Sequence, residues 1–238
     1  MEPVDILTIA AHPDDVELTC SGTLLRMIHQ GYSAGILDLT QGEMGTRGTP
    51  EIRAKEAEAA AMVIGARWRE RMNLGDSRLT ASIENRMAVA ERIRAAKPKT
   101  VILPYWEGRH PDHYTAATLG YEACYAAGLK QLPLAGDPHR PKKILYSAMY
   151  SDVRPSFIVD ITPFFPKKLE AMRCFASQFG GDMREITELY PAWGRLLDRI
   201  TTQCKYFGHL IGAEYAEPFV VKEVLLIDDV VAMPVASI

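Results

Sequence analysis

The sequence has few cysteines and no long apolar run. Only four cysteines occur among the 238 residues, far apart and without a CxxC pair. This usage is typical of a reducing compartment rather than of a disulfide framework. The apolar runs are far shorter than the roughly 20 residues that a membrane span requires, and the opening Met1-Glu2-Pro3 is acidic where a signal peptide is basic. We therefore expect a cytoplasmic protein that does not act at a membrane.

An excess of positive charge is also absent. The formal net charge is -3 and the isoelectric point is near 6.1, which argues against a nucleic-acid partner. The hydrophobic fraction of 47% and the charged fraction of 24% are ordinary for a globular protein. Because the length suffices for one sizeable core, we expect a single domain over residues 1–238.

Strand-like and helical segments alternate along most of the chain. Short, continuous aliphatic runs are typical of buried parallel strands, and they occur at 4–11, 34–39 and 100–103. Helical patterns with capping residues occur at 21–31, 51–64, 82–96 and 112–127. Later segments predict strands at 67–73, 144–149, 157–160, 219–221 and 224–227, and helices at 163–177 and 185–210. This alternation predicts an α/β fold, a single Rossmann-like domain with a mainly parallel sheet flanked by helices.

Chemically unusual residues follow two of these strands. The stretch Ala10-Ala11-His12-Pro13-Asp14-Asp15 comes directly after the first strand, and His110-Pro111-Asp112-His113 follows the strand at 100–103. Histidine and aspartate disfavour burial unless something compensates, as a metal ion does. Because the strand ends of an open α/β sheet deliver side chains to one crevice, the two motifs predict a single site.

Together, His12, Asp15 and His113 supply two imidazoles and one carboxylate. This set leaves coordination positions open, which is the pattern of a catalytic rather than a structural metal site. Asp14, adjacent to a ligand, is then suited to take a proton from water as a general base. The alternative is that His12 or His110 is a helix cap or a hydrogen-bonded polar core residue.

With these two motifs, the chain resembles the PIG-L/LmbE-like family of N-acetylglucosamine deacetylases. Further segments resemble the subgroup of that family that acts in bacillithiol biosynthesis, and they lie at 42–49, 51–53, 188–190 and 212–219. The resemblance covers nearly the whole chain. It implies a hydrolase that removes the N-acetyl group from a glucosamine-type sugar, in which metal-activated water attacks the amide carbonyl.

The resemblance also implies a role for each residue of the two motifs. Three residues would hold the metal: His12, Asp15 and His113. The metal would be zinc, with ferrous iron as the alternative, because these ligand types serve both. Asp14 would be the general base. His110 and Asp112 would form a coupled pair, in which Asp112 orients His110 to stabilise the oxyanion or to protonate the departing amine.

Two further residues match family positions near the metal. Arg53 would stabilise the oxyanion or hold Asp14 in place; the alternative is a solvated helix residue paired with Glu56 or Glu58. Tyr190 would line the pocket and donate to the oxyanion, with core packing as its alternative.

In the bacillithiol subgroup the substrate is N-acetylglucosaminyl malate, which carries two carboxylates. Arg47 and Arg109, beside the two motifs, are suited to bind carboxylates in a bidentate manner, although either could be a plain surface charge. Gln41 and Glu43 begin a glycine-rich loop and would bind sugar hydroxyls. A chitooligosaccharide or a GlcNAc-inositol stays open as the substrate. The resemblance further implies a small amino-sugar conjugate as the partner and a homo-oligomer, with a hexamer as one form.

Two readings outside this family also stay open. Two histidines and one carboxylate form the facial triad of non-haem iron oxygenases, although strand–helix alternation speaks against the double-sheet folds that usually carry it. A non-catalytic protein that binds metal or sugar is the other reading. Such a protein needs no base beside its ligands, so Asp14 and the His110–Asp112 pair favour catalysis.

Overall fold

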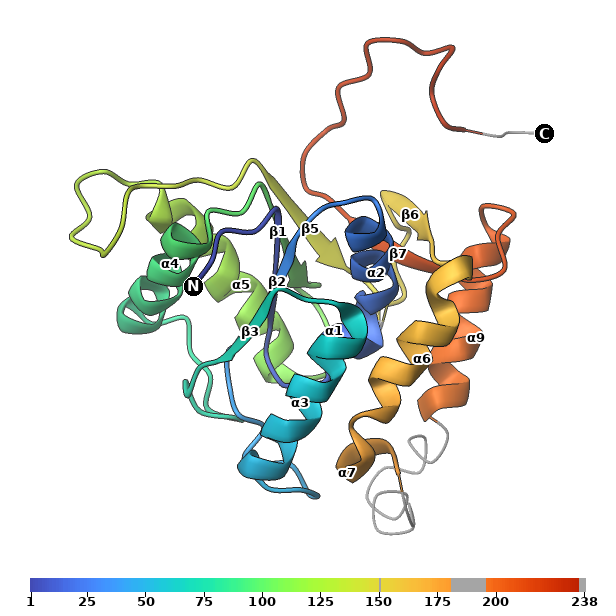
Figure 1. The fold of residues 1–238 in the computed structure, drawn as a ribbon. Helices are drawn as coiled ribbons and strands as arrows, with labels where there is room; N and C mark the ends of the chain where they lie inside the picture. Colours follow the sequence, from blue (N-terminus) through green and yellow to red (C-terminus); the bar gives the residue numbers. More distant parts are fainter. Residues whose placement is uncertain (150, 181–195, 236–238) are drawn as a thin grey trace.

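The computed structural model describes residues 1–149, 151–180 and 196–235, which form a sheet covered by helices on both faces (Figure 1). The sheet has the strand order β3-β2-β1-β4-β5-β7-β6. The strands are β1 (Ile6–Ala10), β2 (Ala34–Asp38), β3 (Trp68–Arg71), β4 (Thr100–Pro104), β5 (Lys143–Ser147), β6 (Phe157–Asp160) and β7 (Ala216–Val220). The helices are α1 (Asp15–Thr19), α2 (Ser21–His29), α3 (Pro50–Ile64), α4 (Ile83–Ala96), α5 (Pro111–Ala127), the 3-10 helix η1 (Thr162–Phe164), α6 (Phe165–Arg173), α7 (Ala176–Phe179) and α9 (Leu196–His209).

The first five strands all run in one direction. β1 pairs in parallel with β2 and β4, and the outer pairs β2–β3 and β4–β5 are parallel as well. β7 lies antiparallel between β5 and β6. The chain passes from β1 to β2 on one side and later crosses to β4 on the other, so the order reverses between β1 and β4. Ligand crevices form at such a switch point. The predicted α/β fold with a mainly parallel sheet is confirmed.

Alternate residues of the central strands enter two separate cores. Leu7 and Ile9 of β1 pack in a cluster with residues of α4 and α5, whereas Ile6 and Ala10 pack with residues of α2 and α3. Residues of α6, α9 and β7 form a further cluster. Burial on both faces explains why these strands are apolar without alternation. Among the described residues, no helix is both long and apolar enough to cross a membrane.

Capping residues set several of the helix boundaries. Thr49 accepts a backbone N–H at the start of α3, and Ser82 does the same for α4. Gly65 ends α3 in the left-handed region, at a φ of 81°, where glycine carries no steric penalty. His110 caps α5 with its ring, so the second motif begins the helix that follows β4 in the chain.

Some expected elements differ from the structure. The helix expected at 163–177 is divided into η1, α6 and α7. The strand expected at 224–227 is wrong, because Val224 is 97% exposed and no strand forms there; strand propensity without a sheet neighbour does not make a strand. The short helix α1 was not expected, since five residues are too few for a periodic pattern. Only residues 196–209 of the expected helix at 185–210 are seen, as α9, and 185–195 lie outside the described residues.

A buried ion pair joins three helices to strand β7. The ammonium of Lys168 on α6 lies 2.8 Å from a carboxylate oxygen of Glu217 on β7, and both side chains are fully buried. Lys168 also donates to the backbone carbonyls of Glu17 and Leu18 on α1, at 2.9 and 3.0 Å. Glu217 accepts the backbone N–H of Thr23 and its hydroxyl on α2, at 2.7 and 2.6 Å. The pair therefore ties α1, α2 and α6 to β7.

We predict that Lys168→Met lowers the free energy of unfolding by about 3–5 kcal/mol, because it leaves the Glu217 carboxylate buried without its cation. Lys167→Met is a matched control, since Lys167 is the exposed neighbour on the same helix, and it should change stability by less than about 0.5 kcal/mol. Urea unfolding of the three proteins measures both values. Equal stability of the two variants would contradict the role given to the pair.

Candidate active site

The two His-Pro-Asp motifs meet at the carboxyl ends of β1 and β4. The first motif forms the turn between β1 and α1, and the second leads from β4 into α5. Asp14 has a φ of 126°, a conformation that non-glycine residues seldom adopt. Such backbone strain is retained where the surrounding structure fixes it, and it is common at functional sites.

His12 lies at the centre of the cluster. Its Nε2 is 3.1 Å from an Asp112 oxygen and 3.2 Å from an Asp76 oxygen, while its Nδ1 is 3.6 Å from Asp15 Oδ2. Asp15 also reaches the second motif, because its Oδ1 is 3.0 Å from His113 Nε2. The structure thus brings His12, Asp15 and His113, the three predicted ligands, into one connected group.

His110 lies beside the other two imidazoles. Its ring centroid is 4.8 Å from that of His12 and 4.9 Å from that of His113. The His110 Nδ1 accepts the backbone N–H of Asp112, so the helix-cap reading of this residue applies within the site. The carboxylate of Asp112 does not pair with the His110 ring in this structure; it contacts His12 and accepts the N–H of Ser77 at 2.7 Å.

Asp76 is a member of the cluster that sequence reasoning missed. It follows β3, the third parallel strand to end at this edge, and its Oδ2 accepts the backbone N–H of Met44 at 2.9 Å. Its own N–H donates to Glu43 Oε1 at 2.8 Å, and Glu43 Oε2 accepts the N–H of Gln41 at 3.2 Å. Glu43 therefore joins the glycine-rich loop to Asp76. The sequence offered no motif for this residue, because Asp76 is a single aspartate that follows a short and mostly polar strand.

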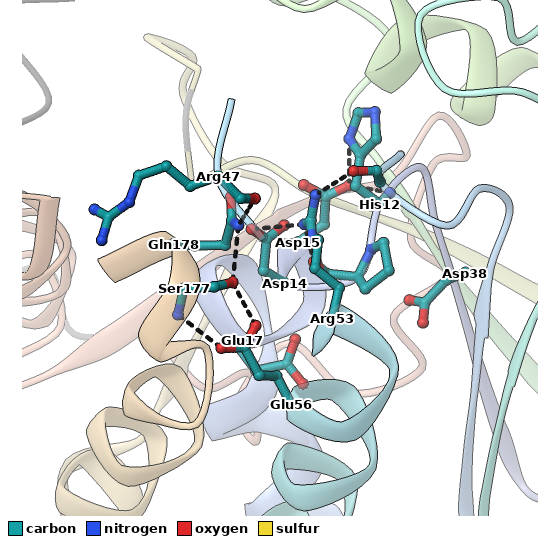
Figure 2. Close-up of polar contacts among 12 residues, drawn as sticks. His12, Asp14, Asp15, Glu17, Asp38, Arg47, Arg53, Glu56, Ser177 and Gln178 are labelled. Atoms are coloured by element: carbon teal, nitrogen blue, oxygen red, sulfur yellow. Dashed lines mark hydrogen bonds and ion pairs between the residues drawn. The ribbon is translucent and has the colours of Figure 1, made fainter. Parts of the chain in front are cut away.

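Arg53 enters the site from α3 and contacts Asp14 (Figure 2). Its Nη2 lies 3.1 Å from Asp14 Oδ2 and donates to the carbonyl of Pro13, and its Nη1 donates to the carbonyl of Gly42 at 3.1 Å. The side chain is almost fully buried. The reading of Arg53 as a solvated partner of Glu56 or Glu58 is therefore wrong.

Of the remaining predicted site residues, Arg47 contacts a segment away from this cluster. The guanidinium of Arg47 donates to the carbonyl of Gly180 at 2.7 Å, and Figure 2 shows its side chain extending away from Asp14. Arg109 is exposed in the loop before His110. Tyr190 lies outside the described residues.

Burial and neighbouring charges shift the pKa values of these groups. Burial raises the pKa of Asp14 to about 7, although the charge of Arg53 lowers it. Burial also acts to raise the pKa of Asp15, but His113 and His12 hold it well below its usual range. Burial alone would lower the pKa of His12, yet its bonds to Asp112, Asp15 and Asp76 raise it to about 12. The carboxylates around His12 therefore strongly favour a positive charge at this position.

Two groups of side-chain donor atoms in this cluster could each hold a divalent metal ion. Nitrogen atoms of His12, His110 and His113 lie within 4.8 Å of one another, and so do donor atoms of His12, Asp76 and Asp112. Imidazole and carboxylate are the ligands that zinc and ferrous iron take in catalytic sites. The carboxyl groups of Asp14, Asp15, Asp76 and Asp112 all lie in this cluster, and a bound cation would balance their negative charge.

Fold and site together define an α/β protein with a candidate metal-dependent active site at the switch point of a parallel sheet. The family model PIG-L, described as GlcNAc-PI de-N-acetylase, matches residues 7–124, a range that holds both His-Pro-Asp motifs. The chain belongs to the PIG-L family.

Relatives and solved structures agree with this assignment. The chain is 32% identical to diacetylchitobiose deacetylase of Thermococcus kodakarensis, over 89% of this chain and 80% of the relative. It is 26% identical to a probable N-acetyl-alpha-D-glucosaminyl L-malate deacetylase 2 of Bacillus anthracis, over 78% of this chain and 86% of that protein. A conserved protein of Thermus thermophilus is 38% identical and superposes with a TM-score of 0.83, covering 94% of this chain and 98% of its own. These findings support a deacetylase for GlcNAc-type substrates.

We predict that His113→Ala weakens Zn²⁺ binding by about 100-fold or more, because loss of a ligand should exceed the 10–100-fold effect of losing an outer-shell partner. Isothermal titration of the chelator-treated protein with Zn²⁺ measures the affinity. His209→Ala, at the exposed end of α9, is the matched control and should bind as the parent does. Equal affinities for both variants would remove His113 from the ligand set.

Proposed function

We propose that this protein is a zinc-dependent deacetylase that hydrolyses the acetamide of an N-acetylglucosamine unit, with a short chitooligosaccharide such as diacetylchitobiose as its substrate. The observation that carries the proposal is the meeting of His12, Asp14 and Asp15 with His110 and His113 at one sheet edge. A protein that only bound metal or sugar would need neither a buried carboxylate beside the ligands nor a third imidazole.

In this proposal His12, Asp15 and His113 would hold the zinc. When bound, the metal supplies Lewis-acid chemistry: it polarises a carbonyl and lowers the pKa of water. Asp14 would act as the general base and remove a proton from the attacking water. A general base works best when its pKa lies near the working pH, and burial brings Asp14 into that range.

Arg53 positions this base. Its guanidinium contacts the Asp14 carboxylate while it also bonds to the carbonyls on either side of the site. The carboxylate is therefore held in one orientation, as a preorganised site requires.

His110 is suited to donate a hydrogen bond on the other side of the scissile bond. Because its Nδ1 accepts the backbone N–H of Asp112, the neutral ring carries its proton on Nε2. That N–H can donate a hydrogen bond to the oxyanion, while the departing amine takes up the proton that Asp14 removed from the water. Partial burial, and then the neighbouring His12 and His113, lower the pKa of His110, which favours this neutral form of the ring.

The choice of substrate rests on the relatives and on the two arginines. The diacetylchitobiose deacetylase is the more similar of the two named enzymes, at 32% against 26% identity. A clamp for two carboxylates would need Arg47, whose guanidinium is engaged by the Gly180 carbonyl. Arg109, exposed near His110, keeps the malate conjugate as the second candidate.

We predict that Asp14→Asn binds Zn²⁺ as the parent does but loses at least about 100-fold in kcat, since general-base catalysis contributes about 10²–10⁴-fold. Acetate release and metal content are measured on the same sample. Asp137→Asn, an exposed position on a remote loop, should leave both unchanged. Retention of most activity in Asp14→Asn would mean that another group is the base.

We predict a higher kcat/KM for diacetylchitobiose than for N-acetylglucosaminyl malate, GlcNAc-inositol or free N-acetylglucosamine, measured as acetate release with zinc present. A higher value for the malate conjugate, lowered about tenfold by Arg109→Ala, would make that conjugate the substrate. Acetate release from none of the four compounds would contradict the deacetylase assignment itself.

A further inference from the structure

The C-terminal segment of the described chain leaves the body after β7. Residues 223–235 form neither helix nor strand, and Figure 1 shows them extending away from the sheet and its helices. From Val224 on, the hydrogen bonds among the described residues join the segment only to itself. We refer to residues 223–235 as the C-terminal arm.

The arm is apolar and exposed. Eight of its side chains are aliphatic or methionine and at least 40% exposed: Val224, Leu225, Leu226, Ile227, Val230, Val231, Met233 and Val235. Contiguous apolar surface of this kind marks an interaction site in a soluble protein. Fully extended, the 13 residues reach about 43 Å, so the arm is long enough to cover a helix.

A matching surface lies on α5 of the same chain. Tyr114, Tyr121 and Tyr125 are 41%, 43% and 59% exposed, and with Thr118 they follow a 4-3-4 spacing that places them on one face of the helix. We call these four residues the tyrosine stripe. It spans roughly 16 Å along the axis, and exposed tyrosines are enriched in protein interfaces.

Charges beside the two surfaces are opposite. The arm carries Asp228 and Asp229 in the middle of its apolar residues. Next to the stripe, the guanidinium of Arg140 lies 4.6 Å from the Tyr125 ring, and the exposed Lys142 and Lys143 follow it in the chain. Complementary charge steers two surfaces together and fixes their register.

We propose that the C-terminal arm docks on the tyrosine stripe of a second copy of this chain. Both surfaces are on one chain, so two copies that exchange arms cover both stripes and both arms in a symmetric interface. The base of the arm fits this arrangement, because the Lys222 ammonium already lies 4.7 Å from the Tyr121 ring while the residues beyond it lead away from their own body. This interface does not depend on the chemistry of the active site.

The oligomeric state tests the proposal. Sedimentation of the full chain should give a multiple of 26.5 kDa, and Val224→Asp/Leu226→Asp/Val231→Asp should reduce it to the mass of one chain at the same concentration. Tyr125→Asp, on the receiving surface, should do the same. Met62→Asp is the matched control, since Met62 is an equally apolar, 74% exposed residue on α3, and it should leave the mass unchanged. Thermal unfolding of each variant shows whether it is folded.

A mixing experiment separates docking between copies from docking within one chain. In a Cys174→Ser background, one preparation carries Leu226→Cys and the other Thr118→Cys. Oxidation of the mixture should give a product with the mass of two chains that neither preparation gives alone. A full-length protein with the mass of one chain, an unchanged mass in the arm variant, or arm-dependent binding to phosphatidylcholine vesicles instead of self-association would each overturn the proposal.

Discussion

The parallel pairing of β1 with β4 is the constraint on which the active site depends. The two strands are adjacent in register from Ile6 opposite Thr100 to Thr8 opposite Ile102, although almost a hundred residues separate them in the chain. Their carboxyl ends therefore release two polar turns into one crevice. Each turn alone would bury an aspartate, Asp15 or Asp112, without the histidine of the other turn that contacts it. Together they create a place where a cation can balance several carboxylates.

Two groups of buried charges away from this crevice are of a different kind, because each holds opposite charges in contact with one another. Arg69 on β3 binds Asp38 in a bidentate manner and reaches Glu17 at 2.7 Å, while Lys168 and Glu217 pair beneath α2. These contacts hold α1, α2 and α6 against the sheet. Asp15, at the start of α1, is therefore held in a fixed position. The structural charges are thus paired by residues of the chain, whereas the charges at the candidate active site leave room for a bound cation.

Features of the fold and site could be predicted from the sequence where burial or strand direction requires a particular type of residue at a particular position. The apolar strands, their order of alternation with helices and the convergence of the two motifs all follow from burial and from strand direction. Asp76 could not be found in this way, since its role depends on β3 lying next to β2, a fact that the sequence does not show. The strand wrongly expected at 224–227 has the same cause. Aliphatic residues indicate that a segment favours burial, but they do not indicate which surface it packs against.

The contacts of Arg53 couple parts of the chain that look independent. A Cβ atom at Gly42, which has a φ of 67°, would overlap with Arg53 Nη1, so the glycine-rich loop follows its path because residue 42 lacks a side chain. The loop, the Asp14 turn and helix α3 consequently form a single geometric unit around one guanidinium. Exchanging this loop for that of a relative, in order to alter sugar recognition, would succeed only if residues 42 and 53 were transferred as a pair.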